Sequence, residues 1–100
     1  MKLNKEFEPI REWAKDKGIL DKGDSKTQYL KLMEEAGELS EAILKEDMVE
    51  IKDAIGDIVV VLTNLAHLCD LTIEECIESA YNEIKNRQGI MKNGTFVKNK

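Results

Sequence analysis

Residues that crosslink or interrupt a chain are scarce in this sequence. It holds two cysteines, one proline and six glycines among 100 residues. A small secreted domain stapled by disulfides would carry more cysteines, so we expect Cys69 and Cys76 to be buried, reduced thiols. Hydrophobic residues make up 42% of the chain. That share is above the level typical of disordered segments, and the body of the chain is therefore expected to fold.

Long apolar runs are missing as well. The longest covers residues 58–62, whereas a membrane-spanning helix needs roughly 20 apolar residues. The N-terminal sequence MKLNKEFEPI has no apolar core of the kind found in a secretory signal. We therefore expect a cytoplasmic protein with no membrane partner.

Positive charge is in short supply, since 15 lysine and arginine residues face 20 acidic ones and leave a net charge of −5. Binding to nucleic acid by charge requires basic patches that neutralise phosphates, so we expect no nucleic-acid partner. An acidic protein can still bind a phosphate ligand through bridging metal ions. The length indicates a single domain over residues 1–100, and a chain this short buries a limited share of its surface. A homodimer or homotetramer is the expected remedy.

Helical periodicity accounts for most of the chain. Apolar residues recur every three or four positions and predict four helices, over about residues 4–17, 25–45, 48–69 and 73–87. A start of the first helix near Glu8 would place Pro9 harmlessly in the first turn. Residues 19–24 are expected to form a loop. Capping boxes are expected at Ser25 with Gln28, Asp47 with Glu50 and Thr72 with Glu75.

The third predicted helix is apolar over most of its circumference and is expected to be the central, most buried element. Its valines and isoleucines also suit a buried strand over residues 58–62, but the length of the pattern favours a helix. Near the C-terminus, Asn93-Gly94 favours a two-residue hairpin turn. The expected fold is an all-α four-helix bundle, assembled as a homo-oligomer, with a short C-terminal β-hairpin.

Acidic residues gather on one flank of each of the two middle helices. At 100° per residue, Glu35 and Glu38 lie together beside the apolar stripe of residues 25–45, with Lys31 next to them. On the following helix, Glu50, Asp53 and Asp57 occupy one narrow arc at the edge of the apolar face. Because a short connection favours antiparallel packing, the two flanks are expected to meet.

Carboxylates that face one another repel unless something positive lies between them. A hard divalent cation such as Mg²⁺, which prefers oxygen ligands, meets that need, and two such ions would clamp a phosphoanhydride. A different reading is that these helix faces are solvated surface. Lys31–Glu35 and Glu41–Lys45 would then be simple ion pairs across one helical turn.

Two stretches of the sequence resemble a known pattern. Residues 31–43 read KLMEEAGELSEAI, and residues 55–62 read IGDIVVVL. They are similar to the E-x-x-E and E-x-x-D elements that MazG-like, all-α nucleotide pyrophosphohydrolases carry on successive helices. The resemblance spans about residues 28–68, and the tail over residues 83–98 is similar to a short, phage- and bacteria-type branch of that group.

The resemblance implies a set of metal ligands. By position, Glu35, Glu38 and Asp57 would bind metal. The glutamate of E-x-x-D falls on Ala54, which cannot bind metal, and Asp53 or Glu50 on the Asp57 face would replace it. The implied cofactor is Mg²⁺, with Mn²⁺ as an alternative.

The resemblance also implies hydrolysis of a nucleoside triphosphate to the monophosphate and pyrophosphate. Glu34 or Glu35 would accept the proton of the attacking water. The candidate substrate contacts are Lys31, Asn64, Lys85, Arg87 and Trp13. One alternative is a relative with a narrower substrate, such as dUTP, dCTP or phosphoribosyl-ATP. The other is a catalytically inactive helical dimer that serves as an interaction or regulatory module, which Ala54 favours.

Overall fold

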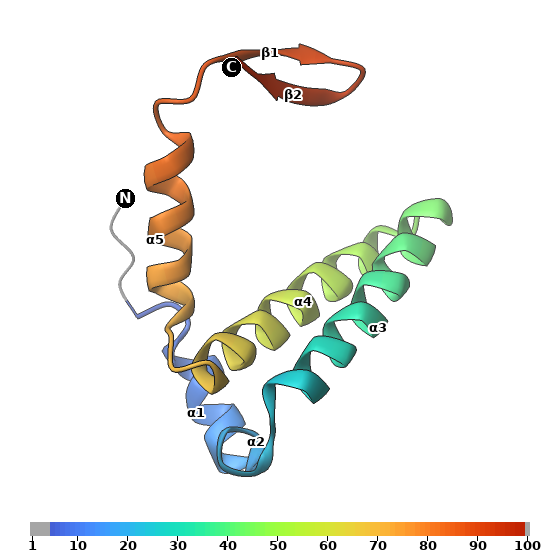
Figure 1. The fold of residues 1–100 in the computed structure, drawn as a ribbon. Coiled ribbons are helices and arrows are strands. Elements are labelled where there is room, and N and C mark those ends of the chain that lie inside the picture. Colours follow the sequence, from blue (N-terminus) through green and yellow to red (C-terminus); the bar gives the residue numbers. More distant parts are fainter. Residues whose placement is uncertain (1–4, 100) are drawn as a thin grey trace.

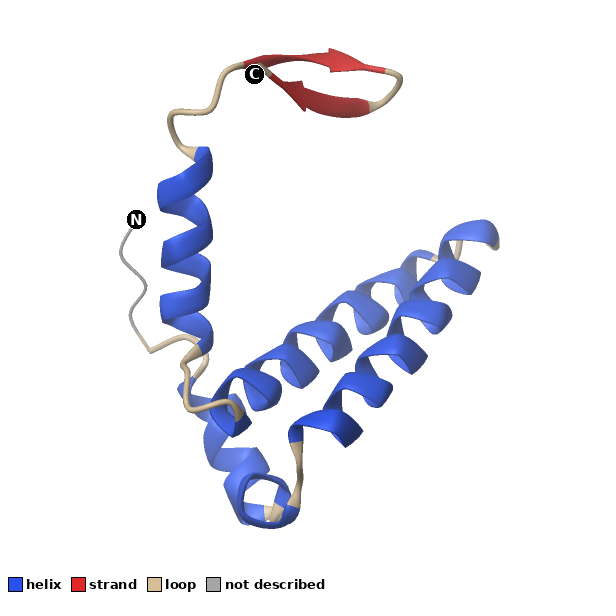
Figure 2. Ribbon diagram, in the orientation of Figure 1, coloured by secondary structure: helices blue, strands red, loops and turns tan. Residues whose placement is uncertain are grey.

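The computed structural model describes residues 5–99, and over this range the chain folds into five helices followed by a two-stranded β-hairpin (Figures 1 and 2). The all-α prediction is confirmed, and so is the C-terminal hairpin. The elements are α1 Glu8–Asp16, α2 Ile19–Lys22, α3 Ser25–Leu44, α4 Met48–Leu68, α5 Ile73–Ile84, β1 Gly89–Lys92 and β2 Thr95–Lys98.

The two long helices, α3 and α4, run side by side as an antiparallel pair (Figure 1). Each begins at an aspartate cap. The Asp24 carboxylate accepts a hydrogen bond from the Thr27 backbone N–H at 2.8 Å, and Asp47 accepts one from Glu50 at 3.1 Å. The expected cap at Ser25 is wrong, because Asp24 has the extended backbone of a cap and Ser25 is already helical.

The first part of the chain forms two short helices at one end of the α3–α4 pair. α1 begins at Glu8 with Pro9 in its first turn, and the expected helical residues before position 5 lie outside the described range. Gly18, at φ 80°, lets the chain turn out of α1, since that left-handed conformation suits a residue without Cβ. The expected loop over residues 19–24 is wrong in part, because α2 occupies Ile19–Lys22.

Helix α5 leaves α4 at a bend of 102° and stands away from the α3–α4 pair (Figure 1). Its start is held by the predicted capping box, in which Thr72 and Glu75 exchange hydrogen bonds. It ends at Ile84, one turn earlier than expected. No single helix within residues 5–99 is long and apolar enough to cross a membrane; α4 and α5 reach that threshold only as a bent pair.

The hairpin that follows α5 pairs β1 with β2 in an antiparallel register. Asn93 and Gly94 form its turn with positive φ angles of 51° and 81°, as the sequence predicts. Neither strand packs on a helix within the described part of the chain. The competing strand over residues 58–62 does not form, because this segment lies inside α4.

The buried core of the single chain is small. Its apolar members are Ala14, Ala42, Ala54, Val61 and Ala66. Most of the buried side chains belong to α4, which confirms it as the central helix. The accessible surface is 7798 Å², whereas a compact monomer of this mass exposes about 5,800 Å². The radius of gyration is 15.9 Å, against about 13 Å for a compact chain of this length.

The cysteine prediction is half right. Both thiols are free, but Cys69 is exposed and Cys76 is only half-buried. Cys69 is exposed because it follows the last residue of α4, where the chain leaves the core.

A paired hydrogen bond ties α1 to α5. The Arg11 guanidinium donates to both carboxylate oxygens of Glu74, at 2.7 and 2.6 Å, and also to Glu8 at 3.0 Å. The Arg11 and Glu74 side chains are 14% and 19% exposed, so solvent screens this pair less than a surface pair. The pair therefore fixes the base of α5 against α1.

We expect Glu74→Gln to lower the free energy of unfolding by about 1–3 kcal/mol at pH 7, because it removes charge-assisted hydrogen bonds. The hydrogen bonds from Arg11 hold the pKa of Glu74 below its ordinary value of 4.5. The contribution of the pair is thus fully present above that pH and is lost as the pH falls through the lowered pKa. Denaturant titrations at one protein concentration, from pH 7 downward, measure both effects.

Glu78→Gln, on the exposed side of the same helix, is the matched control and is expected to unfold like wild type. Equal stability of wild type and Glu74→Gln at pH 7 would contradict a stabilising role for the pair. So would a difference that does not shrink in acid.

Candidate metal and nucleotide site

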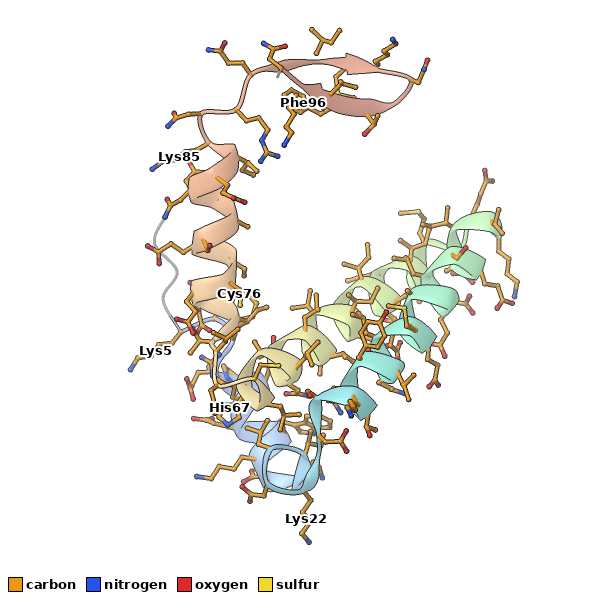
Figure 3. All side chains as sticks on the ribbon, viewed as in Figure 1. Lys5, Lys22, His67, Cys76, Lys85 and Phe96 are labelled. Atoms are coloured by element: carbon orange, nitrogen blue, oxygen red, sulfur yellow. The ribbon has the colours of Figure 1, made fainter. Side chains whose placement is uncertain are left out.

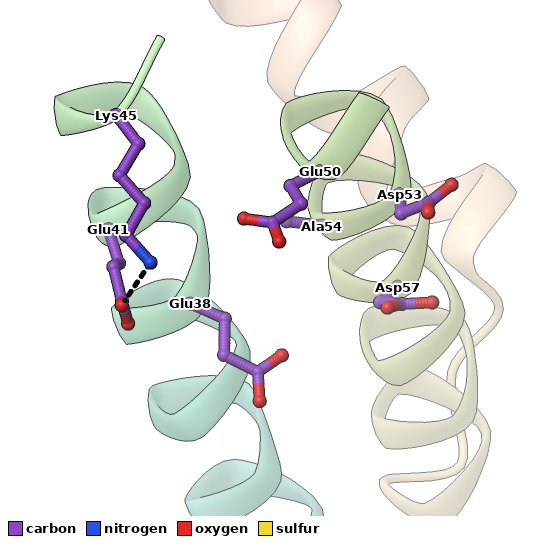
Figure 4. A pocket seen from close by; sticks show the side chains of 7 residues that line it. All are labelled: Glu38, Glu41, Lys45, Glu50, Asp53, Ala54 and Asp57. Carbon is purple, nitrogen blue, oxygen red and sulfur yellow. Dashed lines mark ion pairs between the residues drawn. The ribbon is translucent and has the colours of Figure 1, made fainter. Parts of the chain in front are cut away.

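An open pocket of about 290 Å³ lies on one flank of the α3–α4 pair. Its lining comes from α3 and from the facing part of α4 (Figure 4). Both helices contribute carboxylates, as their predicted antiparallel packing requires. The lining residues, here called the acidic pocket, are Glu38, Glu41, Lys45, Glu50, Asp53, Ala54 and Asp57.

Two carboxylates extend into the space between the helices. Glu38 reaches from α3 toward α4, and Glu50 reaches from α4 toward α3 (Figure 4). Ala54 lies one turn after Glu50 on the same side of α4 and is only 5% exposed. Among the two candidates to replace a carboxylate at position 54, Glu50 therefore points toward the opposing helix.

Asp53 and Asp57 line the same pocket from the outer side of α4, and both point away from α3 (Figure 4). Within residues 5–99, no three acidic, histidine or cysteine side chains lie close enough to hold one metal ion together. The predicted flanks thus meet at one pocket without converging on one point. Glu38, Glu50, Asp53 and Asp57 are all solvent-exposed.

Glu35 lies one turn before Glu38 and is buried, at 6% exposure. One carboxylate oxygen pairs with the Lys31 ammonium at 3.3 Å. The other, Oε2, has no hydrogen-bond partner within the described residues. A buried oxygen without a partner is costly, and a hard cation is one group that would satisfy it. The residues around the pocket therefore offer carboxylate oxygens, the ligand atoms that a divalent ion such as Mg²⁺ prefers.

Glu38 already reflects the crowding of negative charge. The negative charge of Glu35, one helical turn away, is the largest cause that raises the pKa of Glu38 above its ordinary value. Lys31 opposes this only weakly, because it pairs with Glu35 at 3.3 Å and with Glu34 at 3.7 Å. Glu38 therefore takes up a proton more readily than an isolated carboxylate would, because nearby negative charge disfavours its ionised form.

Two side chains of the site were missed by sequence reasoning. Glu41 and Lys45 line the pocket, and their predicted ion pair forms at 2.8 Å. The signal was available, since Glu41 lies three residues after Glu38 and shares its helix face. Helical spacing predicts the ion pair, but it does not show whether the pair lies on open surface or at the rim of a pocket.

The proposed substrate contacts are scattered over the chain. Asn64 is 2% exposed on α4, and its side-chain Oδ1 has no hydrogen-bond partner within residues 5–99. Trp13 is half-exposed on α1 and does not line the acidic pocket. Lys85 caps the far end of α5, away from α3 and α4 (Figure 3), and Arg87 follows it. Within one chain, Lys85 and Arg87 are not brought to the carboxylates.

The arrangement defines a class of protein: a helical domain that presents a carboxylate-lined pocket between two antiparallel helices. Residues 24–90 match the model of the MazG nucleotide pyrophosphohydrolase domain. The match covers α3, α4 and α5, and this chain belongs to that family.

A curated relative comes from Haemophilus phage HP1. It is named "Uncharacterized 18.2 kDa protein in rep-hol intergenic region" and is 42% identical over 57 residues. These residues are 57% of this chain and 35% of the phage protein, so the match spans about a third of that relative. No solved structure matches this chain.

We expect a carboxyl-detected NMR titration to place the pKa of Glu38 above that of an isolated glutamate. Glu35→Gln removes the neighbouring charge and should bring the pKa of Glu38 down, because charge repulsion is the largest cause of the shift. Glu46→Gln, outside the pocket on the α3–α4 connection, is the control and should leave Glu38 unchanged. An ordinary pKa for Glu38 in the wild type would show that the two carboxylates are not in contact.

Proposed function

We propose that this chain is a Mg²⁺-dependent enzyme that hydrolyses a ribo- or deoxynucleoside triphosphate between its α and β phosphates. The products are the monophosphate and pyrophosphate. The observation that carries the proposal is the acidic pocket, formed by facing carboxylates of α3 and α4 in a chain of the MazG family. Mn²⁺ is the alternative ion.

Glu35, Glu38 and Asp57 are the proposed metal ligands, with Glu50 or Asp53 in the place left by Ala54. The direction of the Glu50 side chain, toward α3, supports Glu50 (Figure 4). When bound, Mg²⁺ supplies positive charge at the phosphoryl oxygens and makes a water molecule easier to deprotonate. Glu34 or Glu35 accepts the proton of the attacking water. The burial and the unpartnered oxygen of Glu35 support Glu35 in that role.

Two polar groups on the same two helices as the carboxylates are proposed to position the nucleotide. Lys31 offers an ammonium that is half-exposed and held by Glu34 and Glu35. Asn64 offers a buried amide with an unsatisfied oxygen, which can accept a hydrogen bond from a sugar hydroxyl or a base amine.

With Mg²⁺ present, we expect pyrophosphate release from at least one nucleotide of a panel of ribo- and deoxynucleoside triphosphates. Glu38→Gln and Asp57→Asn should each lower kcat on the order of a hundredfold, because each removes a charge that stabilises the transition state through the ion. Circular dichroism should find both variants folded, since both side chains are exposed. A pyrophosphate-coupled assay measures the rates, and Glu78→Gln should match the wild type.

A second candidate function is a catalytically inactive interaction or regulatory module. Ala54 favours this candidate. It lines the acidic pocket with an apolar side chain at the position where the E-x-x-D pattern carries a glutamate. This candidate predicts no pyrophosphate from any nucleotide and no rise in melting temperature with Mg²⁺ or Mn²⁺. The same panel and a thermal shift measurement therefore decide between the two.

We also propose that the chain works as a homodimer or homotetramer built on the α3–α4 pair. A shallow apolar hollow of about 580 Å³, here called the apolar patch, lies near the tip of that pair. Its lining is Met48, Val49, Ile51, Lys52 and Ile55. Met48 and Val49 are 71% and 70% exposed, and nearby Leu44 is 82% exposed. The exposed surface exceeds that of a compact monomer by about 2,000 Å², which is more than one partner buries in a standard interface.

Sedimentation equilibrium at micromolar concentration should therefore find a dimer or tetramer. Val49→Asp with Ile55→Asp places two charges in the apolar patch and should weaken self-association at least about a hundredfold, since burying unpaired charge is costly. Lys52→Ala is the control, because it keeps the patch apolar. A stable wild-type monomer at these concentrations would rule out the proposed assembly.

A further inference from the structure

The β-hairpin near the end of the chain packs on no helix within residues 5–99. We call residues 85–99, which contain the β-hairpin, the arm. Ile90 pairs with Val97 and Met91 pairs with Phe96 across the strands, so each face of the hairpin carries one apolar pair. All four side chains are exposed. A lone two-stranded hairpin is marginally stable in water, so this one needs a surface that its own helices do not provide.

The arm also has the opposite charge from the rest of the chain. The arm holds four lysine and arginine residues and no acid. Residues 1–84 hold ten cations and all 20 acids, so a segment of charge +4 follows a body of charge −10. Opposite charges of this size attract over distances of several ångströms.

Two of the arm's cations converge. A hollow of about 530 Å³ lies between the end of α5 and the base of the hairpin. The Asn99 backbone N–H donates a hydrogen bond to the Gln88 carbonyl at 2.8 Å and closes the base of the hairpin. We call this hollow the arm hollow. Arg87 and Lys98 supply positive charge there, and three side-chain amides can donate hydrogen bonds. Its lining is Glu83, Asn86, Arg87, Gln88, Lys98 and Asn99.

The acidic pocket lacks what the arm hollow offers. Among its lining residues the cation is Lys45, which already pairs with Glu41 at 2.8 Å. A nucleoside triphosphate carries several negative charges, and a metal ion on the carboxylates neutralises part of them. Additional cations on the far side of the phosphates would complete the neutralisation, and Arg is well suited to bind phosphate oxygens in pairs.

Within one chain, the structure does not bring the cations of the arm to the acidic pocket. Helix α5 rises about 18 Å over its 12 residues, and the 102° bend directs it away from the α3–α4 pair (Figure 1). The capping box and the bond between Arg11 and Glu74 hold its base in that direction. The arm therefore begins at the end of α5 that lies away from α3 and α4 (Figure 3).

We propose that the arm of one copy docks over the acidic pocket of a second copy, and that the arm hollow binds the phosphate groups of the nucleotide held there. The proposal rests on the proposed function for its ligand. Charge complementarity selects the occupant, because the carboxylate-lined groove and the basic arm belong to the same chain. The apolar pairs of the hairpin would then pack on the exposed apolar surface beside that groove.

Mixed dimers test this directly. Co-expression of Glu38→Gln under one tag with a double variant, Arg87→Ala and Lys98→Ala, under another allows the mixed dimer to be purified through both tags. Each parent homodimer should be nearly inactive. The mixed dimer should recover about half of the wild-type kcat, because one of its two sites combines an intact pocket with an intact arm. A site built within one chain would leave the mixed dimer as inactive as its parents, and that result overturns the proposal.

Lys22→Ala with Lys26→Ala removes the same charge from exposed positions elsewhere and is the matched control. Alone it should be active, and paired with Glu38→Gln it should also give half. Wild-type turnover in the Arg87→Ala and Lys98→Ala variant would overturn the arm's role as well.

A measurement of self-association separates the arm from the proposed function. If the wild type released no pyrophosphate, the proposed function would fail, and docking would be decided by sedimentation at low salt. Arg87→Glu with Lys98→Glu should raise the dissociation constant about fivefold, which corresponds to two exposed ion pairs. Lys22→Glu with Lys26→Glu should not. An unchanged dissociation constant in the arm variant would overturn docking.

Discussion

The close packing of α3 against α4 is the constraint on which the site depends. Small buried side chains, Ala42 on α3 and Ala54 on α4, let the two backbones approach. The same approach brings Glu38 and Glu50 into one groove and holds Glu35 in the interior beside it. The Lys31 ion pair offsets part of the repulsion that results, and the repulsion raises the pKa of Glu38. Packing energy from the core therefore maintains a concentration of negative charge that would disperse on an isolated helix.

The exposed surface and the acidic pocket raise the same question of what completes this chain. The apolar patch at the tip of the α3–α4 pair and the unsupported hairpin both expose groups that a compact monomer would bury. The Arg11–Glu74 pair determines the direction of α5 and hence where the arm can reach. A stabilising contact far from the carboxylates thus helps to set where the cationic side chains of the arm lie relative to the acidic pocket.

Membership of the MazG family accounts for the helices and for the pattern of acids, but Ala54 departs from the resembled motif. The structure gives this departure a physical meaning, because Ala54 faces the groove and Glu50 extends into the same space from one turn earlier. A carboxylate is thus offered from position 50 into the space that the small side chain of Ala54 leaves open. Asp53, equally acceptable by helical spacing, leaves α4 on the outer side. Spacing along a helix shows which acidic residues share a face. The direction of each side chain then shows which of them extends toward the opposing helix.

The sequence by itself determined the helices, their caps at Asp47 and Thr72, the hairpin turn and the acidic flank of each middle helix. These follow from local rules, namely periodicity, capping chemistry and the preference of Asn-Gly for positive φ. The sequence did not reveal α2 or the cap at Asp24. At the start of α3, Asp24 and Ser25 are both good capping residues, and spacing alone does not show which of them is the cap. Only the tertiary structure decided the bend of α5, the isolation of the arm and the burial of Glu35. Those depend on contacts between residues far apart in the chain, such as Arg11 and Glu74, and no local pattern encodes them.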